Sequence, residues 1–291
     1  MKLIKPYFEI IEPTGYTIDD IYKSIELAGK VSHKSEHTIK EGSAKNFVER
    51  IINWGHNSCL EFGTVYLYIN YHHPNFSKIV DKYYNNPYSE CIVSVNEVFI
   101  TSNYRVLIEN EWLNDLKYLC EPTKFHMKRY TIKFICSRSI SHEFVRHRKF
   151  SFMQESQRYV AYNKDRFNHR VTFIQPNWFT HDLSDKVFSE IPFSLLQNTP
   201  EDGYKEVEEV FIKSAIEAEQ NYFELLKNGL KPEEAREVLP NATKTELYMC
   251  GFTKDWEQFF RLRDDKQHAH PMAYELAHPL HEEFIKRGWC E

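Results

Sequence analysis

Hydrophobic residues recur with two periods along this chain, and the change of period separates expected strands from expected helices. Residues 2–11 predict a strand. Thr17 can cap a helix whose first turn carries Asp19 and Asp20, which favour the positive end of a helix dipole. That helix is expected to end near Gly29.

A second helix is expected to be capped by Ser43 and to stop at Gly55. Its apolar face consists of Ala44, Phe47, Val48, Ile51 and Ile52. Period-two alternation then predicts a strand, in which Val65, Leu67 and Ile69 alternate with Thr64, Tyr66 and Tyr68.

The middle of the chain is less regular. Between residues 70 and 130 there are two proline breaks, and we expect a short strand near 97–101 and an amphipathic helix around 104–119. Residues 130–137 predict a buried strand that runs into a short helix through Phe144.

The last third is mostly helical. After a strand near 171–175, the longest helix is expected over 204–228, closed by Gly229. Pro232 opens a short helix, a strand follows it, and two further helices are expected near 253–262 and 268–287. Regular βαβ alternation is lacking, so the pattern predicts the α+β class.

Composition narrows the class of protein. The 291 residues are 42% apolar and 27% charged, which is typical of a globular protein. The net charge of −5 argues against a dedicated nucleic-acid binder. The N-terminus does not resemble a signal peptide and no apolar run is long enough for a membrane helix, so we expect a cytoplasmic protein.

The cysteines and histidines do not form a recognisable metal site. The six cysteines are scattered without a CxxC pair, which favours neither a disulfide framework nor zinc. His268 and His270, with His72 and His73, are conceivable ligands, but HxH alone is a weak signal and we expect no metal.

The densest chemistry lies in residues 146–159, RHRKFSFMQESQRY. Arginine presents a planar fork of donors that suits phosphate or carboxylate, so this segment predicts an anionic ligand. No glycine-rich phosphate loop is present, so side chains must hold any phosphate. If residues 139–148 are helical, Arg146 and Arg148 point to nearly opposite sides; alternatively, Glu143 pairs locally with Arg146 and His147.

Two further clusters carry polar groups. In residues 54–61, His56 follows a helix and precedes a strand, so it is either a cap or a catalytic group. The third cluster comprises residues 235–240, 256–263 and 268–270.

Together these clusters resemble the flavin-dependent thymidylate synthases. The segment RHRKFSFMQESQRY matches the family's RHR motif, its spaced serine and its SxRY motif. Two further segments match the family in the expected order: GHNSCLE (55–61), and AREVLP continuing through TELYMCGFTKDWEQFFRLR (235–263). The resemblance covers roughly residues 15–70 and 130–285. It implies an α+β fold with a central, mostly antiparallel sheet flanked by helices, in a single domain (1–291) with a probable insertion at 71–128.

The resemblance also implies an activity. Such enzymes methylate dUMP to dTMP with methylenetetrahydrofolate as carbon donor, and take the hydride from NADPH through FAD. They form homotetramers with shared active sites, without nucleic-acid or membrane partners.

Residue by residue, the resemblance assigns three roles. Arg263 and His56 match catalytic positions; a cation at Arg263 would favour the uracil ring with its N3 proton lost. Positions matching dUMP contacts are Glu143, Arg146, Gln154, Glu155, Ser156, Gln157, Arg158, Arg236 and Arg263. Positions matching FAD contacts are Ser32, Ser58, Glu61, Arg146, His147, Arg148, Gln154, Phe252, Lys254, Gln258 and His268.

The chain departs from the family at several of these positions. Glu143 stands where Gln is frequent, so its carboxylate needs a partner, and Phe62 replaces a common histidine. Phe252, Lys254 and Gln258 also differ from the usual residues. Two alternatives therefore stay open: an RNA- or nucleotide-binding module that uses the arginines, and an inactive family member with a structural role.

Overall fold

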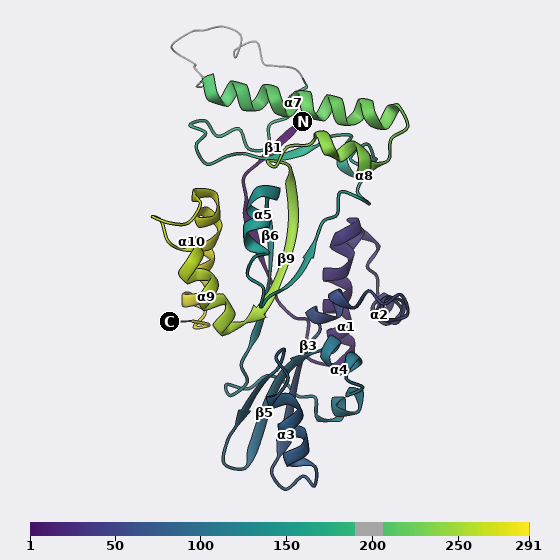
Figure 1. Cartoon of the computed structure of the whole chain (residues 1–291), viewed down its shortest axis with the longest axis vertical. Coiled ribbons are helices and arrows are strands. Elements are labelled where there is room, and N and C mark those ends of the chain that lie inside the picture. The colour runs from purple at the N-terminus through teal and green to yellow at the C-terminus, as the bar shows by residue number, and fades with distance from the viewer. Residues whose placement is uncertain (190–205, 291) are drawn as a thin grey trace.

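A four-stranded antiparallel sheet with the order β2-β6-β9-β7 lies at the centre of the chain, in a computed structural model that describes residues 1–189 and 206–290 (Figure 1). Strand β6 (Arg129–Ser137) pairs with β9 (Lys244–Phe252) along its whole length. Strands β2 (Tyr7–Ile11) and β7 (Ser151–Gln154) flank this pair. The predicted α+β class with an antiparallel sheet is confirmed; β7 was not predicted as a strand.

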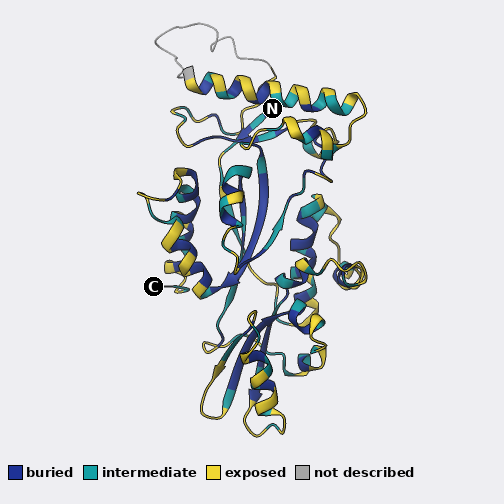
Figure 2. Cartoon of the chain, in the orientation of Figure 1, coloured by how far each residue is buried: buried dark blue, intermediate teal, exposed yellow. Residues whose placement is uncertain are grey.

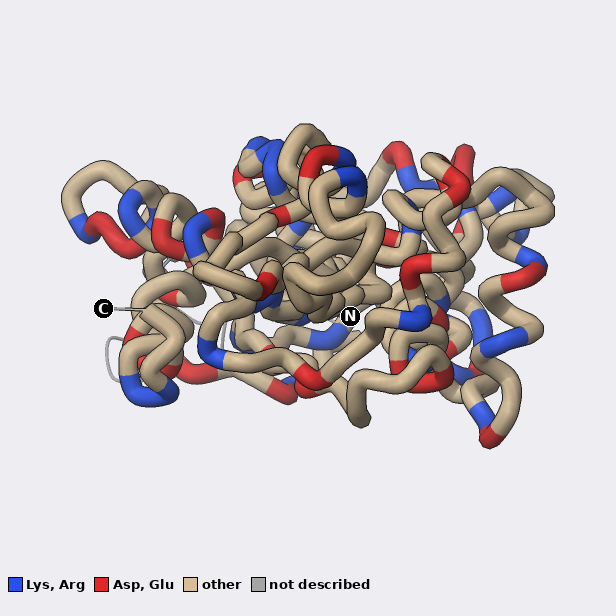
Figure 3. Tube along the Cα trace, turned by 90° about the horizontal axis from the view of Figure 1, so that it is seen from below, with Lys and Arg blue, Asp and Glu red and all other residues tan. Residues whose placement is uncertain are grey.

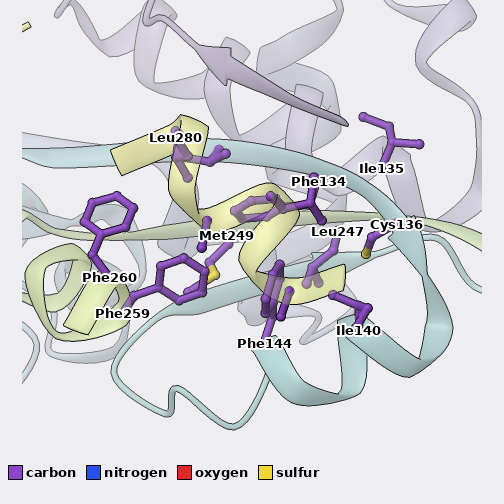
Figure 4. Close-up of a cluster of buried hydrophobic side chains, with 14 of the residues drawn as sticks. Phe134, Ile135, Cys136, Ile140, Phe144, Leu247, Met249, Phe259, Phe260 and Leu280 are labelled. Atoms are coloured by element: carbon purple, nitrogen blue, oxygen red, sulfur yellow. The ribbon is translucent and has the colours of Figure 1, made fainter. Parts of the chain in front are cut away.

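One face of this sheet carries the largest hydrophobic core. Ile132 and Phe134 of β6 lie beside Leu247 and Met249 of β9 because alternate residues of a strand share a face. Helices α5 (Arg138–Phe144), α9 (Thr253–Arg263) and α10 (Pro271–Lys286) cover them. Figure 4 shows how phenylalanines from β6, α5 and α9 meet in this cluster. The sheet thereby holds α5 next to α9.

The start of α10 differs from the prediction. This helix begins at Pro271 and not at residue 268, because the His270 side chain caps it by accepting from the Met272 amide.

The opposite face of the sheet is covered by the N-terminal helices. Helix α1 (Ile18–Lys30) begins at the predicted cap, where Thr17 and Asp20 bond each other's backbone amides. Ser43 is not the cap of α2 (Ser43–Asn53) but its first residue, and its hydroxyl donates to Glu26. A 3₁₀ helix, Asn57–Phe62, leads from α2 into the next strand.

Residues 64–118 form a second lobe, here called the distal lobe, at the end of the molecule farthest from α7 (Figure 1). It contains a second antiparallel sheet, β3-β5-β4, whose apolar core is continuous with the buried faces of α1 and α2. Its elements are β3 (Thr64–Asn70), α3 (Phe76–Tyr84), β4 (Glu90–Val93), β5 (Glu97–Asn103) and α4 (Tyr104–Glu109).

Within the distal lobe the sequence predictions are partly wrong. The strand near 97–101 is present, but α3 and β4 were not predicted. The helix expected over 104–119 is broken: α4 ends before Glu111, which has a positive φ, and a 3₁₀ helix, Leu113–Tyr118, follows.

At the other end of the molecule, strand β1 (Lys2–Ile4) pairs in parallel with β8 (Thr172–Ile174). The predicted strand 2–11 is therefore two strands in different sheets, separated at Pro6, which has no amide hydrogen to donate. Helices α7 (Glu206–Lys227) and α8 (Pro232–Ala235) lie against β1 and β8. The first two residues of the predicted helix 204–228 lie outside the described residues.

Burial follows this layering. The central strands and the inner faces of the helices are buried, whereas outer helix faces and loop tips are exposed (Figure 2). Among the described residues, no helix is both long and apolar enough to cross a membrane.

Candidate active site

The arginine-rich motif begins in a turn and not in a helix. Helix α5 ends at Phe144, so the prediction that Arg146 and Arg148 project from opposite sides of one helix is wrong. Both arginines are exposed, and neither has a side-chain partner among the residues that the structure describes. They are therefore available to an anion.

Arg263 is held in a defined orientation at the end of α9. Its Nη1 donates to the Glu143 carboxylate (2.7 Å), and its Nη2 donates to the Glu143 carbonyl oxygen (3.1 Å). Its Nε donates to His147 Nε2 at 3.1 Å. The expectation that Glu143 pairs with Arg146 or His147 is wrong, since the charge partner of Glu143 is Arg263.

His147 is kept neutral by this arrangement. Burial lowers the pKa of its imidazole, and the Arg263 guanidinium lowers it further, to about 4. Because Nε2 accepts from Arg263, the ring proton belongs on Nδ1. His147 can therefore act as a neutral hydrogen-bonding group at physiological pH.

The residues after β7 enter a buried polar network. Gln154 donates to the hydroxyls of Ser141 and Thr245, which fixes its amide between α5 and β9. Glu155 is almost fully buried, and its carboxylate accepts from Lys244 Nζ at 2.9 Å. Gln157 is only 6% exposed, and its side chain lies against the Tyr162 hydroxyl without a hydrogen bond of good geometry from Nε2. A buried amide with only a poorly aligned partner is unfavourable compared with one that is fully hydrogen-bonded.

Lys244 also pairs with Glu246, its neighbour on the same face of β9. Burial favours the protonated form of Glu246, but surrounding positive charges outweigh this and hold the pKa of the carboxyl well below its ordinary value. These charges come from Lys244, Lys34 and Lys133.

Backbone contacts bring the N-terminal region to the motif. The Ser156 amide donates to the Ser32 carbonyl oxygen at 3.0 Å, so these two predicted positions are adjacent. Arg158 reaches Glu233 of α8 at 3.4 Å, and Arg236 follows one turn later. Ser32, Ser156, Arg158 and Arg236 therefore gather on the α8 side of the sheet.

A separate cavity of about 460 Å³ lies between the motif and the distal lobe. Four predicted flavin positions line it: Glu61, Arg148, Phe252 and Lys254. Arg105 and Arg129, which were not predicted, also line it, together with Lys149. Its volume is within the usual range for small-molecule sites.

The remaining predicted positions do not line this cavity. His56 is exposed and its side chain makes no cap bond to the described residues, while the Ser58 hydroxyl donates to Met153 Sδ at 3.9 Å. Gln258 is exposed, and His268 pairs with Asp265. Over residues 1–189 and 206–290, no group of three potential ligands is arranged to hold a metal ion.

Another cavity, of about 450 Å³, lies between β2, β6 and α1. None of the predicted site residues lines it.

Fold and site together define an α+β protein in which side-chain cations line a cavity and no glycine-rich phosphate loop occurs in the sequence. The family model of the thymidylate synthase complementing protein matches residues 92–287. The chain belongs to this family.

Curated relatives carry related names. The chain is 30% identical to a flavin-dependent thymidylate synthase of Pyrococcus abyssi over 152 residues, 52% of each chain. It is 29% identical to a probable flavin-dependent thymidylate synthase of Paramecium bursaria Chlorella virus 1 over 195 residues, 64% of this chain and 81% of the other. The match thus spans about half the length of the archaeal relative.

Among solved structures, a UMP/dUMP methylase PolB from Streptomyces cacaoi, bound with 5-Br UMP, aligns with 98% of this chain and 92% of its own. The sequence identity is 16% and the TM-score is 0.45.

Proposed function

We propose that this protein is an FAD-dependent thymidylate synthase that methylates dUMP to dTMP. Methylenetetrahydrofolate would supply the carbon and NADPH the reducing equivalents. The observation that carries the proposal is the convergence of Glu61, Arg148, Phe252 and Lys254, from three separate motifs, on one cavity. Family membership supports the same conclusion.

The residues present fit a flavin dinucleotide. Arg148 and Lys149 line the cavity without an ion-pair partner among the described residues, and the hydrogen bonds of Arg129 there go to neutral oxygens. Asp255 of the same cavity interacts electrostatically with Lys149 and Arg129, so the cations outnumber the carboxylate that faces them. Cations of this kind suit a diphosphate. When bound, the flavin would supply hydride transfer, while the protein supplies binding and orientation.

Arg263 is the residue that we assign to the reacting pyrimidine. Its guanidinium would stabilise negative charge on N3 and O4 of the uracil ring, which makes C5 a stronger carbon nucleophile. The uracil must share or displace the Glu143 carboxylate that now occupies Nη1. Gln157, whose Nε2 makes no hydrogen bond of good geometry, would donate to dUMP in the complete site.

Shared active sites in a homotetramer follow from the same proposal. The cavity between the arginine-rich motif and the distal lobe does not include Arg263, Gln157 or Arg158. The residues assigned to dUMP and those assigned to FAD therefore form separate surfaces of one chain. Packing of identical subunits would bring such surfaces together. A reducing cytoplasm is also proposed, in keeping with the six free cysteines.

The decisive experiment measures NADPH oxidation and dTMP formation by the FAD-loaded protein, each with and without dUMP. We expect dTMP to form and to require dUMP, folate and NADPH together. A protein that takes up no FAD, even with dUMP present, would refute the proposal. FAD uptake without turnover would instead identify an inactive family member.

The RNA-binding alternative is less well supported. Basic and acidic residues are interspersed along the chain in Figure 3, whereas a nucleic-acid surface usually gathers positive charge. Salt-dependent RNA binding without dUMP-dependent NADPH oxidation would favour this alternative.

A further inference from the structure

The acidic residue that follows Arg263 lies at an unfavourable position for a carboxylate. Asp264 is the C-cap of α9, and the carbonyl end of a helix carries partial negative charge. The Asp264 side chain keeps only 14% of its accessible surface, so water offers little compensation. Asp264 therefore needs hydrogen-bond donors from elsewhere in the fold.

Two histidines of α10, which packs beside α9 (Figure 1), supply these donors. Asp264 Oδ1 accepts from His278 Nδ1 at 2.9 Å, and Oδ2 accepts from His281 Nδ1 at 2.7 Å. The two histidines are three positions apart, so they project from the same face of α10. Because a carboxylate only accepts, each ring carries its proton on Nδ1. Both oxygens of Asp264 thus join the end of α9 to α10.

Ring stacking holds both histidines in place. The His281 ring stacks on Phe260 of α9, with centroids 4.4 Å apart and an angle of 14° between the planes. The His278 ring stacks on Tyr274, one turn earlier in α10, with centroids 5.0 Å apart. Phe260 belongs to the buried core of the central sheet. The contact with Asp264 is therefore supported by packing on both helices.

Arg263, the residue directly before Asp264, is restrained from two sides. Its side chain is bonded to Glu143 and His147, whereas its backbone ends α9, in a turn whose carbonyl groups have no partners further along the helix. A uracil at Nη1 would share or displace the Glu143 carboxylate, which weakens the first restraint. The contact of Asp264 with α10 uses no group that the ligand would replace, so the second restraint remains.

We propose that Asp264, held by His278 and His281, is a positioning residue that keeps Arg263 aligned while a pyrimidine occupies its guanidinium. The inference rests on the proposed function for the identity of the ligand, but the contact between α9 and α10 does not depend on it. Alignment matters because a misplacement of about 1 Å can lower a reaction rate about 100-fold.

The test removes the contact from each side. The double variant His278→Phe, His281→Phe keeps a ring at each stacking position and removes both donors to Asp264. Asp264→Ala removes the acceptor, and the double variant carries the test if Asp264→Ala does not fold. Asp165→Ala is the matched control, because it removes an equal charge and an acceptor of His169 (2.9 Å) outside α9 and α10.

Three measurements on the FAD-loaded protein separate positioning from a general loss of structure. In both test variants, hydrogen–deuterium exchange at residues 261–264 should be about 10-fold faster, because the last turn of α9 opens more often. The rate of dTMP formation at saturating dUMP should fall about 10- to 100-fold. The calorimetric affinity for dUMP should change less than about threefold, because the assigned contacts of Arg158 and Arg236 lie on other elements.

Each outcome decides the inference. If wild type forms dTMP and the test variants match it in exchange and rate, the inference is wrong and the proposed function stands. A dUMP affinity that falls as far as the rate would leave Asp264 a structural role only, and would also overturn the inference. If wild type forms no dTMP, the proposed function fails; faster exchange in the variants then still supports the restraint on Arg263, and unchanged exchange refutes both.

Discussion

Replacing Glu143 with glutamine should strengthen the binding of an ionised uracil at Arg263. The glutamine oxygen can still accept from Nη1, and the backbone carbonyl bond from Nη2 is unaffected, so the guanidinium keeps its orientation. What changes is the negative charge that competes with the ligand for Arg263.

The size of the effect follows from this geometry. Unit charges about 4 Å apart interact by about 1 kcal/mol in water and about 4 kcal/mol at an effective dielectric constant near 20. The side chains of Arg263 and Glu143 keep 17% and 29% of their accessible surface, so an intermediate environment applies. We therefore expect a gain of about 1–3 kcal/mol, a factor of roughly 5–150 in affinity.

The assay is a calorimetric titration of the FAD-loaded enzyme with dUMP and with 5-fluoro-dUMP, whose ring loses its N3 proton more readily. The gain in Glu143→Gln should be larger for the fluorinated ligand and should grow as the pH rises and the ring ionises. Glu217→Gln, at an exposed position on α7, is the control for net charge. Equal or weaker binding of both ligands by Glu143→Gln would show that the carboxylate does not compete for Arg263.

Three further predictions concern stability and titration. Lys244→Met should destabilise the fold by about 3–5 kcal/mol in urea unfolding, because it removes the cation that pairs with the buried Glu155. A second change, Glu155→Gln, should recover part of this loss, and strictly additive costs of the two changes would contradict the pairing. Gly251→Ala places a methyl group 2.5 Å from the Phe150 ring and should cost about 1–3 kcal/mol, whereas an unchanged melting temperature would mean that the ring moves freely. The pKa of His147 in the folded state, about 4, lies below its ordinary value of 6.5, so its contribution to stability is present above pH 6.5 and declines as pH falls towards 4. The advantage of wild type over His147→Asn in melting temperature should shrink over that window, and an NMR midpoint near 6.5 for this ring would contradict the assignment.

Local sequence patterns were sufficient for many of the individual elements. Thr17 begins α1 because its side chain and that of Asp20 satisfy nearby backbone groups. The apolar run of β6 and the long stripe of α7 likewise predicted their elements. The motif around residue 150 indicated an anionic ligand because arginine donors are costly to leave without partners. These inferences depend on neighbours within a few positions, which a sequence displays directly.

Tertiary structure decided which of these groups meet. Glu143 has nearby candidate partners in sequence, but packing of α5 against α9 supplies Arg263, 120 positions later, in a geometry that a short turn does not offer to Arg146. Arg129 has no motif around it; its importance emerges only because β6 returns from the distal lobe beside Glu61 and Ser151. Long-range pairing depends on how separate apolar faces pack together, and that arrangement determines where the charges of this site converge.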